Sequence, residues 1–207
     1  MSSVRIKLCG VRNARDAVMC AEAGADEIGV VFAPRSRRCV SLQTAREIRS
    51  ALPQHVPLVG VFEDADLAEA MRIADEVGLA AVQLHGTLPT PAGKLPLYAA
   101  VRVEGETPLA RLPALRGFRR LLLDGPAGGG GGVSFAWSVA RNAHGAFDGE
   151  LFVAGGLTSD NVADAIRAAR PDGVDVSTGI EGRDGFKDAD RVRAFVQAAR
   201  SAAAEIP

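Results

Sequence analysis

Short apolar runs alternate with longer amphipathic stretches along the whole chain. The runs are rich in Val, Leu and Ile, as expected of strands that are covered on both faces. We expect strands at residues 5–8, 28–32, 58–62, 81–84, 97–103, 120–124, 151–154 and 173–176. The pattern therefore predicts eight strands joined by seven connections, with a final stretch after the last strand.

Most of the stretches that follow these strands carry the signals of an α-helix. In the first, Asn13 can cap the helix, small apolar residues form one face, and Gly24 can end it. Similar patterns predict helices near residues 41–52, 64–77, 135–143, 159–169 and 192–199. The connections at 87–96 and 107–117 are interrupted by prolines, which leaves room for at most a short helix in each.

Alternation of strands and helices implies a parallel sheet. Eight such units without a dinucleotide-binding fingerprint favour a closed barrel over an open sheet. We therefore predict an α/β fold, a single (β/α)8 TIM-barrel domain over residues 1–207, with reduced helices after strands four and five. With 207 residues, 47% of them hydrophobic, the chain is long enough to bury one sizeable core.

Charge and composition narrow the classes of partner. The chain has 24 basic and 25 acidic residues and a formal net charge of −1, without a basic stripe for a nucleic acid. No segment has the roughly 18 apolar residues of a membrane span, and the N-terminus lacks a signal-peptide pattern. We expect a cytoplasmic protein that binds neither nucleic acid nor membrane. Three cysteines and three histidines without ligand spacing predict free thiols and no metal site.

Candidate catalytic residues lie at strand ends, where TIM barrels carry their active sites. Cys9 ends the first predicted strand and Asp124 ends the sixth, after three leucines. An isolated cysteine is more often a core residue, as we expect for Cys20 within a helix. A carboxylate after an apolar run is costly unless it is paired, solvated or catalytic. Two titratable groups at one pocket mouth favour acid–base chemistry on a sugar phosphate.

Two glycine-containing turns predict a phosphate site. Gly155-Gly156 and Thr178-Gly179 follow the seventh and eighth strands, where barrels often bind phosphate through backbone N–H groups. Ordinary turn glycines are the alternative, but their occurrence in adjacent loops favours phosphate binding. The five glycines at 128–132 are not a P-loop, because no Gly-Lys-Ser/Thr follows, and a mobile lid or a plain linker would fit them equally well.

Further pocket candidates come from the remaining strand ends. Arg38 follows the second strand in a run of arginines and would either be solvated or bind a substrate carboxylate. His85, at the end of the fourth strand, is more often a hydrogen-bonded structural residue than a catalyst. Asp175 lies in the eighth strand and is a further pocket residue, whereas we expect Gln83 to be structural.

Several motifs occur in one order and at one spacing from about Arg5 to the final helix. They are Lys7-Leu-Cys-Gly10, Gly24-Ala-Asp26, Ser36-x-Arg38, Val82-Gln-Leu-His-Gly86, Leu121-Leu-Leu-Asp124, Ala154-Gly-Gly-Leu157 with Asn161-Val162, and Val174-Asp-Val-Ser-Thr-Gly179 with Glu181. In combination they closely resemble the phosphoribosylanthranilate isomerase family of tryptophan biosynthesis. The combination is far more specific than any single motif.

This resemblance implies an Amadori rearrangement of N-(5-phosphoribosyl)anthranilate to 1-(2-carboxyphenylamino)-1-deoxyribulose 5-phosphate, without a cofactor. It implies that Asp124 is the acid that opens the ribose ring and that Cys9 is the base that removes the C2′ proton. It also implies that Arg38 binds the anthranilate carboxylate and that the two glycine-containing turns bind the phosphate. Monomers and homodimers both occur in the family.

The implied roles require particular pKa values. A free thiol is only a few per cent ionised at neutral pH, so we expect a helix N-terminus or Lys7 to lower the pKa of Cys9, although Lys7 could also face away from the barrel interior. An acid must be protonated when the substrate arrives, and the leucines beside Asp124 are expected to raise its pKa by desolvation.

Two alternatives stay open at this point. Another phosphosugar isomerase or epimerase could use the same barrel. Related two-substrate isomerases resemble a two-aspartate design, however, and metal-dependent epimerases would need more strand-end histidines than His85. A non-catalytic phosphosugar-binding barrel would not need both Cys9 and Asp124. Departures from the family pattern at Ala99, Ala136 and Asp184 bear on turnover and lid behaviour.

Overall fold

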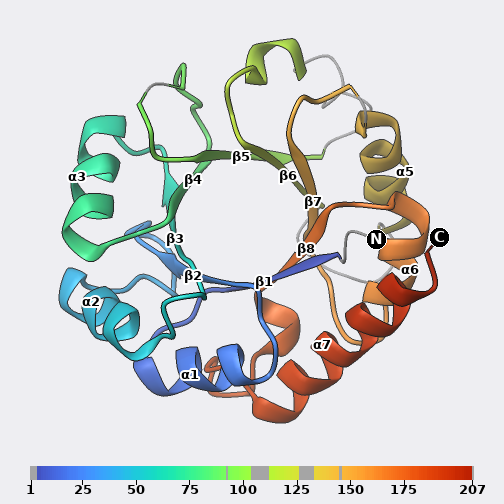
Figure 1. Cartoon of the computed structure of the whole chain (residues 1–207), viewed down its shortest axis with the longest axis horizontal. Helices are drawn as coiled ribbons and strands as arrows, with labels where there is room; N and C mark the ends of the chain where they lie inside the picture. Colours follow the sequence, from blue (N-terminus) through green and yellow to red (C-terminus); the bar gives the residue numbers. More distant parts are fainter. Residues whose placement is uncertain (1–3, 92, 104–111, 126–132, 145, 207) are drawn as a thin grey trace.

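Eight parallel strands close into a barrel in the computed structural model, which describes residues 4–91, 93–103, 112–125, 133–144 and 146–206 (Figure 1). The strands are β1 (Arg5–Cys9), β2 (Glu27–Val31), β3 (Leu58–Glu63), β4 (Ala81–His85), β5 (Leu97–Arg102), β6 (Arg120–Asp124), β7 (Glu150–Ala154) and β8 (Gly173–Val176). Each strand pairs with its neighbours in chain order, and β8 pairs with β1, where Lys7 lies opposite Asp175. The predicted TIM barrel is confirmed.

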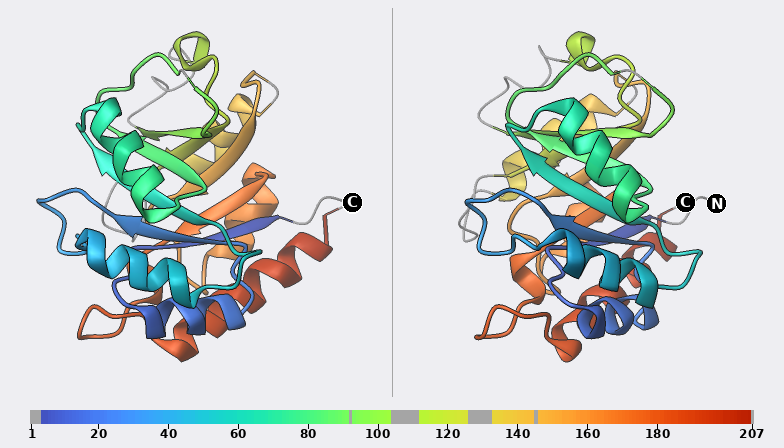
Figure 2. Two further views of the ribbon diagram at one scale, coloured as in Figure 1. Left: turned by 60° about the vertical axis from the view of Figure 1, so that its left-hand side comes forward. Right: turned by 90° about the vertical axis from the view of Figure 1, so that its left-hand side faces the viewer.

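Helices cover most of the outside of this barrel. They are α1 (Ala14–Glu22), α2 (Leu42–Ala51), α3 (Leu67–Val77), α5 (Val133–Ala143), α6 (Val162–Ala169) and α7 (Ala189–Ala204), with short 3-10 turns η1 (Leu112–Leu115) and η2 (Thr178–Ile180). Among the described residues between β4 and β5 and between β5 and β6, only η1 is helical, so the predicted reduction of these two connections is confirmed. The side views show α1, α2 and α7 packed along one flank of the barrel (Figure 2).

Helix starts follow local capping chemistry and correct two predicted boundaries. Asn13 accepts a hydrogen bond from the Asp16 backbone N–H at 2.8 Å, as expected of an N-cap. The helix α6 was expected to be capped near Ser159, but Thr158 and Asn161 form a hydrogen-bonded turn there, so α6 begins only at 162. The helix α5 begins at 133, two residues before its predicted start. The five-glycine run at 128–132 lies outside the described residues.

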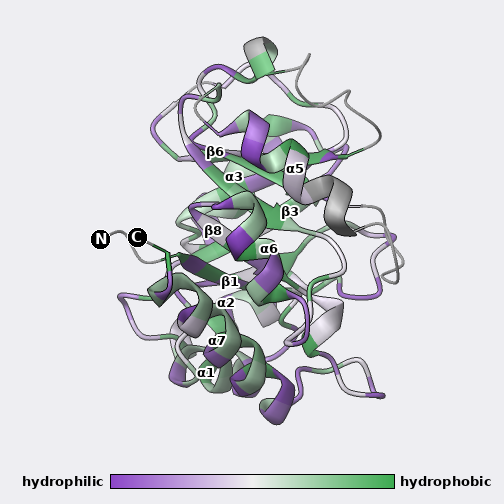
Figure 3. Cartoon of the chain, turned by 90° about the vertical axis from the view of Figure 1, so that its right-hand side faces the viewer, coloured by the Kyte–Doolittle hydropathy of each residue, from purple (hydrophilic) through white to green (hydrophobic). Residues whose placement is uncertain are grey.

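Strand alternation divides the interior into two regions. In β1, Ile6 and Leu8 join the large core between the strands and the helices, whereas Lys7 and Cys9 point into the barrel. Hydrophobic residues follow the strands, and hydrophilic residues are spread over the helices and loops (Figure 3). No helix in the described ranges has both the length and the apolar character that crossing a membrane requires.

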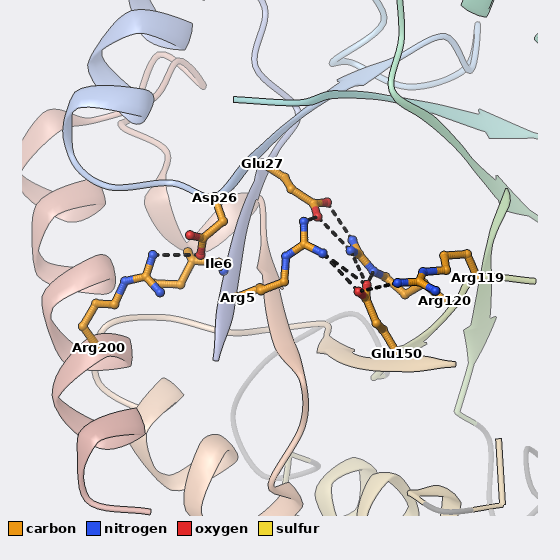
Figure 4. A network of polar contacts seen from close by, with 8 residues as sticks. All are labelled: Arg5, Ile6, Asp26, Glu27, Arg119, Arg120, Glu150 and Arg200. Carbon is orange, nitrogen blue, oxygen red and sulfur yellow. Dashed lines mark hydrogen bonds and ion pairs between the residues drawn. The ribbon is translucent and has the colours of Figure 1, made fainter. Parts of the chain in front are cut away.

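The N-terminal end of the barrel is filled by an ion-pair network (Figure 4). Arg120 is fully buried and donates to Glu27 at 2.6 and 2.7 Å and to Glu150 at 2.6 Å. Arg5 forms ion pairs with both carboxylates. Each of these residues begins its strand, so the four charges meet at one end of the barrel and balance one another. The C-terminal end of the barrel is lined by a different set of residues.

Two aromatic rings complete this layer. The Arg120 guanidinium carbon lies 4.0 Å from the centroid of the Tyr98 ring and 3.7 Å from that of the Phe152 ring. Cation–π contacts and hydrogen bonds therefore replace the hydration that a buried guanidinium loses. This packed, charge-balanced layer fills the N-terminal end of the barrel interior, below the residues of the C-terminal end.

Candidate active site

A cavity of about 480 Å³ lies at the C-terminal ends of the strands. The nine site residues expected from the sequence all line this cavity. They are Cys9, Arg38, His85, Asp124, Gly155, Gly156, Asp175, Thr178 and Gly179. They come from β1, β4, β6 and β8 and from the loops after β2, β7 and β8. Barrel closure thus brings together residues that are far apart in the chain.

Beneath Cys9 lies a buried ammonium group. Lys7 faces the barrel interior, where it is fully buried and its Nζ donates to Asp175 Oδ1 at 2.7 Å. The alternative that Lys7 faces away is therefore wrong. Burial alone would lower the pKa of Lys7, but the charge of Asp175 and the hydrogen bond to it raise that pKa, so the group stays protonated.

The thiol of Cys9 is in a more apolar position than expected. Burial raises its pKa, and this outweighs the lowering effect of Lys7 and Lys187, while Asp175 raises it further. The expected effect of Lys7 is present, but the expected net lowering of the Cys9 pKa is wrong. Cys9 is therefore predominantly a thiol at neutral pH.

The carboxyl group of Asp124 has a raised pKa of about 6. Burial is the main cause and the nearby charge of Asp175 adds to it, against the lowering effects of Arg102 and Lys7. Of the three leucines before it, Leu122 lines the same cavity, because alternate residues of β6 point into the barrel. The expected desolvation of Asp124 is confirmed.

His85 is neutral in this site. Its pKa is lowered to about 4 by burial and by the charge of Lys7. Its Nε2 lies 2.9 Å from the Nε2 of Gln83, so a hydrogen bond fixes the ring. Gln83 was expected to be structural, yet it also lines the cavity, and its buried Oε1 has no partner among the described residues. That oxygen can accept a hydrogen bond from a ligand.

The loops after β7 and β8 meet closely at the cavity wall. Gly155 and Gly156 have φ angles of 83° and 65°. A Cβ on Gly179 would lie 1.9 Å from the carbonyl oxygen of Leu157, so only glycine fits there. The helix α6 begins shortly after the first loop, which adds the partial positive charge of its N-terminus. Backbone in this arrangement suits an anionic group such as phosphate.

Arg38 is held by a carboxylate for which the sequence indicated no role. Its Nε and Nη2 donate to the two carboxylate oxygens of Glu181, and Arg37 and Lys187 bind the same carboxylate. Glu181 follows the predicted phosphate loop by two residues. A single buried acid leaves no periodic signal, so only its place in a longer motif marked it.

The described residues offer no obvious metal site. Within the described ranges, no group of three or more His, Cys, Asp and Glu side chains is arranged to hold a metal ion. The three cysteines are free thiols, of which Cys9 and Cys20 are buried and Cys39 is exposed. Independently of this, Cys9 and Asp124 are two titratable groups that line one cavity, an arrangement that can support proton transfer to and from a bound molecule.

Comparison with known proteins agrees with this geometry. The family model described as N-(5'phosphoribosyl)anthranilate (PRA) isomerase matches residues 6–198. The N-(5'-phosphoribosyl)anthranilate isomerase of Myxococcus xanthus is 43% identical in an alignment 207 positions long, which covers 96% of this chain and 97% of that protein. The family match extends over nearly all of the barrel.

Solved structures show the same relationship. The phosphoribosyl anthranilate isomerase of Thermotoga maritima aligns with a TM-score of 0.88 and 39% identity, covering 96% of this chain and 99% of that one. A phosphoribosyl anthranilate isomerase in complex with reduced 1-(o-carboxyphenylamino)-1-deoxyribulose 5-phosphate aligns with a TM-score of 0.86 and 37% identity, with the same coverage. Fold, motifs and full-length identity lead to one conclusion: the chain belongs to the N-(5'-phosphoribosyl)anthranilate isomerase family.

Proposed function

We propose that the chain converts N-(5-phosphoribosyl)anthranilate to 1-(2-carboxyphenylamino)-1-deoxyribulose 5-phosphate, with Cys9 as general base and Asp124 as general acid. This aldose–ketose isomerisation is a step of tryptophan biosynthesis, and we infer a cytoplasmic enzyme that works as a monomer or a homodimer. The observation that carries the proposal is the convergence of Cys9 from β1 and Asp124 from β6 on one cavity bounded by the glycine loops.

In the proposed reaction, Asp124 donates a proton to the ribose ring oxygen and the C1′–O bond breaks to give a Schiff base. Cys9 then removes the C2′ proton, and the electron pair of that bond forms the C1′–C2′ double bond of an enolamine. Tautomerisation of the enolamine to the ketone completes the isomerisation, and a proton returns from Cys9 to Asp124. Overall no atom is gained or lost.

Two anionic groups orient the substrate in this proposal. Arg38 binds the anthranilate carboxylate as a planar donor. The loops that contain Gly155, Gly156, Thr178 and Gly179 bind the phosphate through backbone N–H groups. In this proposal the ribose lies in the cavity that Cys9, Asp124, His85 and Asp175 line.

The first test is turnover by the unmodified chain. Freshly generated N-(5-phosphoribosyl)anthranilate is mixed with the purified protein, and the loss of anthranilate-type fluorescence is recorded. Rapid enzyme-dependent loss is expected. Binding of the reduced product analogue without turnover would instead indicate a non-catalytic phosphosugar-binding barrel, and turnover of a different phosphosugar alone would indicate another isomerase or epimerase.

The pH profile of kcat/KM should have two limbs. The active form has Asp124 protonated and Cys9 ionised. Since the pKa of Asp124 is about 6 and that of Cys9 is raised, this form is a minor species. Its share rises with pH to about 6, stays level, and falls above the pKa of Cys9. Initial rates across the pH range measure this profile.

Asp175→Asn identifies the acidic limb. The substrate phosphate also titrates at a pH of about 6, so a shift of the limb is the diagnostic result. Asp175 raises the pKa of Asp124, and its neutralisation should move the acidic limb to lower pH, while the titration of the substrate is unchanged. An acidic limb at the same pH in both proteins would contradict the role of Asp124.

Gly10→Ala should weaken substrate binding through Arg38. Gly10 has φ of +74°, and a Cβ there would lie 2.4 Å from Arg38 Cδ, so the arginine must move. We expect KM to rise about tenfold, a loss of about 1.4 kcal/mol of binding energy. Gly24→Ala is the matched control: its φ is +100° but its nearest contact is Val196 at 3.4 Å. An equal KM in the two variants would contradict the prediction.

A further inference from the structure

We propose that Glu181 is a positioning residue that presents Arg38 to the carboxylate of the substrate. The inference rests on the proposed function, because it deepens the role of Arg38 in recognising anthranilate. In this role Glu181 determines which edge of the Arg38 guanidinium faces the cavity. The same arrangement makes Glu181 a determinant of specificity for substrates with a carboxylate.

The hydrogen bonds of Arg38 leave one nitrogen for the ligand. Nε and Nη2 form the side edge of the guanidinium, and both donate to Glu181, Nη2 at 3.0 Å. The second hydrogen of Nη2 can reach Thr178 Oγ1, which lies 2.7 Å from it. Of the five N–H donors of an arginine, the two on Nη1 have no acceptor within the described part of the chain. A substrate carboxylate can therefore bind at Nη1 while Glu181 keeps the side edge of the guanidinium.

Glu181 is itself rigidly held. It is 4% exposed, and its backbone pairs with Lys187 in an antiparallel bridge. Its carbonyl oxygen accepts a hydrogen bond from Arg191 at 2.9 Å. Lys187 contributes its Nζ at 3.4 Å, and that Nζ also donates to the Ser177 carbonyl at 3.0 Å. The carboxylate is thus a fixed point, whereas Arg38 alone is a long side chain with several rotatable bonds.

The charges of this cluster suit an anionic ligand. Arg37 and Arg38 carry two positive charges against the single negative charge of Glu181, so the cluster keeps a net positive charge even apart from Lys187, whose pKa is lowered by burial. Burial would raise the pKa of Glu181, but the hydrogen bond from Arg38 and the charges of Lys187 and Arg37 lower it, so it remains ionised. Glu181 orders the cations without cancelling their attraction for carboxylate and phosphate.

Two opposite outcomes separate positioning from competition. If Glu181 positions Arg38, then Glu181→Gln frees the guanidinium to adopt several orientations, and a carboxylate ligand binds more weakly. If Glu181 instead competes with the ligand for Arg38, the same substitution removes the competitor and adds net positive charge, so the ligand binds more tightly. The sign of the change therefore decides between these two roles.

The experiment compares two ligands in calorimetric titrations. One is reduced 1-(o-carboxyphenylamino)-1-deoxyribulose 5-phosphate, and the other is the same compound without the carboxyl group. In Glu181→Gln we expect the carboxylate ligand to bind about tenfold more weakly and the carboxyl-free ligand to bind within about twofold of the unmodified chain. Steady-state assays should show a matching rise in KM with little change in kcat.

Matched variants separate the proposal from general damage. Glu205→Gln is the control, because Glu205 also accepts from Nε and Nη2 of an arginine, Arg167, but on the outer surface. Lysine cannot make the paired hydrogen bonds that Nε and Nη2 of Arg38 make with Glu181. In an Arg38→Lys background, Glu181→Gln should therefore weaken binding of the carboxylate ligand little further. Equal weakening of both ligands, or tighter binding of the carboxylate ligand, would overturn the proposal. If the unmodified chain binds neither ligand, the proposed function itself fails.

Discussion

Asp124→Asn is expected to lower kcat by about 10²–10⁴-fold and to stabilise the folded protein at the same time. The loss of activity follows from general acid catalysis, because the amide has no proton to give to the ribose ring oxygen. The gain in stability follows from the raised pKa of Asp124, which makes its ionised form unfavourable in the folded state.

The direction of the stability change depends on pH. Folding raises the pKa of Asp124 from 3.8 to about 6. Between these values the native state binds more protons than the unfolded chain, so the free energy of unfolding falls as the pH rises through this range. Above it the full cost of ionisation, about 3 kcal/mol, remains. Asn cannot ionise, so the variant should gain about 1–3 kcal/mol near pH 8 and little near pH 4.

Urea denaturation of both proteins at several pH values measures this difference. Asp75→Asn is the control, because Asp75 is an exposed residue of α3 away from the cavity. A stability gain that is the same at every pH would indicate better packing of the amide and not relief from an ionised group. Loss of both activity and stability would indicate that Asp124 supports the fold.

The sequence predicted the strands, the barrel and the residues that line the cavity, because these depend on local signals and on topology. Apolar runs mark strands covered on both faces, and a closed parallel barrel places every strand end at one face. Cys9 and Asp124 could be assigned to one pocket on this basis, although 115 positions separate them in the chain.

Interactions between charged side chains were not predictable in the same way. Nothing local shows that Lys7 pairs with Asp175 across β1 and β8, since the pairing depends on barrel closure and register. The pKa of Cys9 is raised by burial and lowered by two cations, Lys7 and Lys187. The sequence shows the cations but not the degree of burial, so the net direction could not be predicted. The contact of Arg38 with Glu181 joins two loops, whose conformations follow no periodicity.

Cys9→Ser is the second substitution with a large expected effect. A hydroxyl is a much weaker acid than a thiol, so its conjugate base is unavailable, and kcat should fall by about 10²–10⁴-fold. Binding of the reduced product analogue should change little. Serine is smaller than cysteine, and the residue beside the sulfur on strand β2 is Gly29, so the hydroxyl meets no side chain there. Fluorescence assays of turnover and calorimetry of the analogue test the two parts separately.

Alkylation kinetics connect this loss to the ionisation of Cys9. The rate of inactivation by iodoacetamide follows the thiolate, so its pH dependence reports the pKa of the reacting cysteine. Cys39→Ser provides the background, since Cys39 is the exposed thiol. We expect a pKa above that of a free thiol and protection by the product analogue. Turnover that survives Cys9→Ser, together with a lowered pKa, would mean that Cys9 is a reactive cysteine of the pocket but not the base. The proton at C2′ would then have to pass to another group, and Asp175, which lines the same cavity, is a candidate.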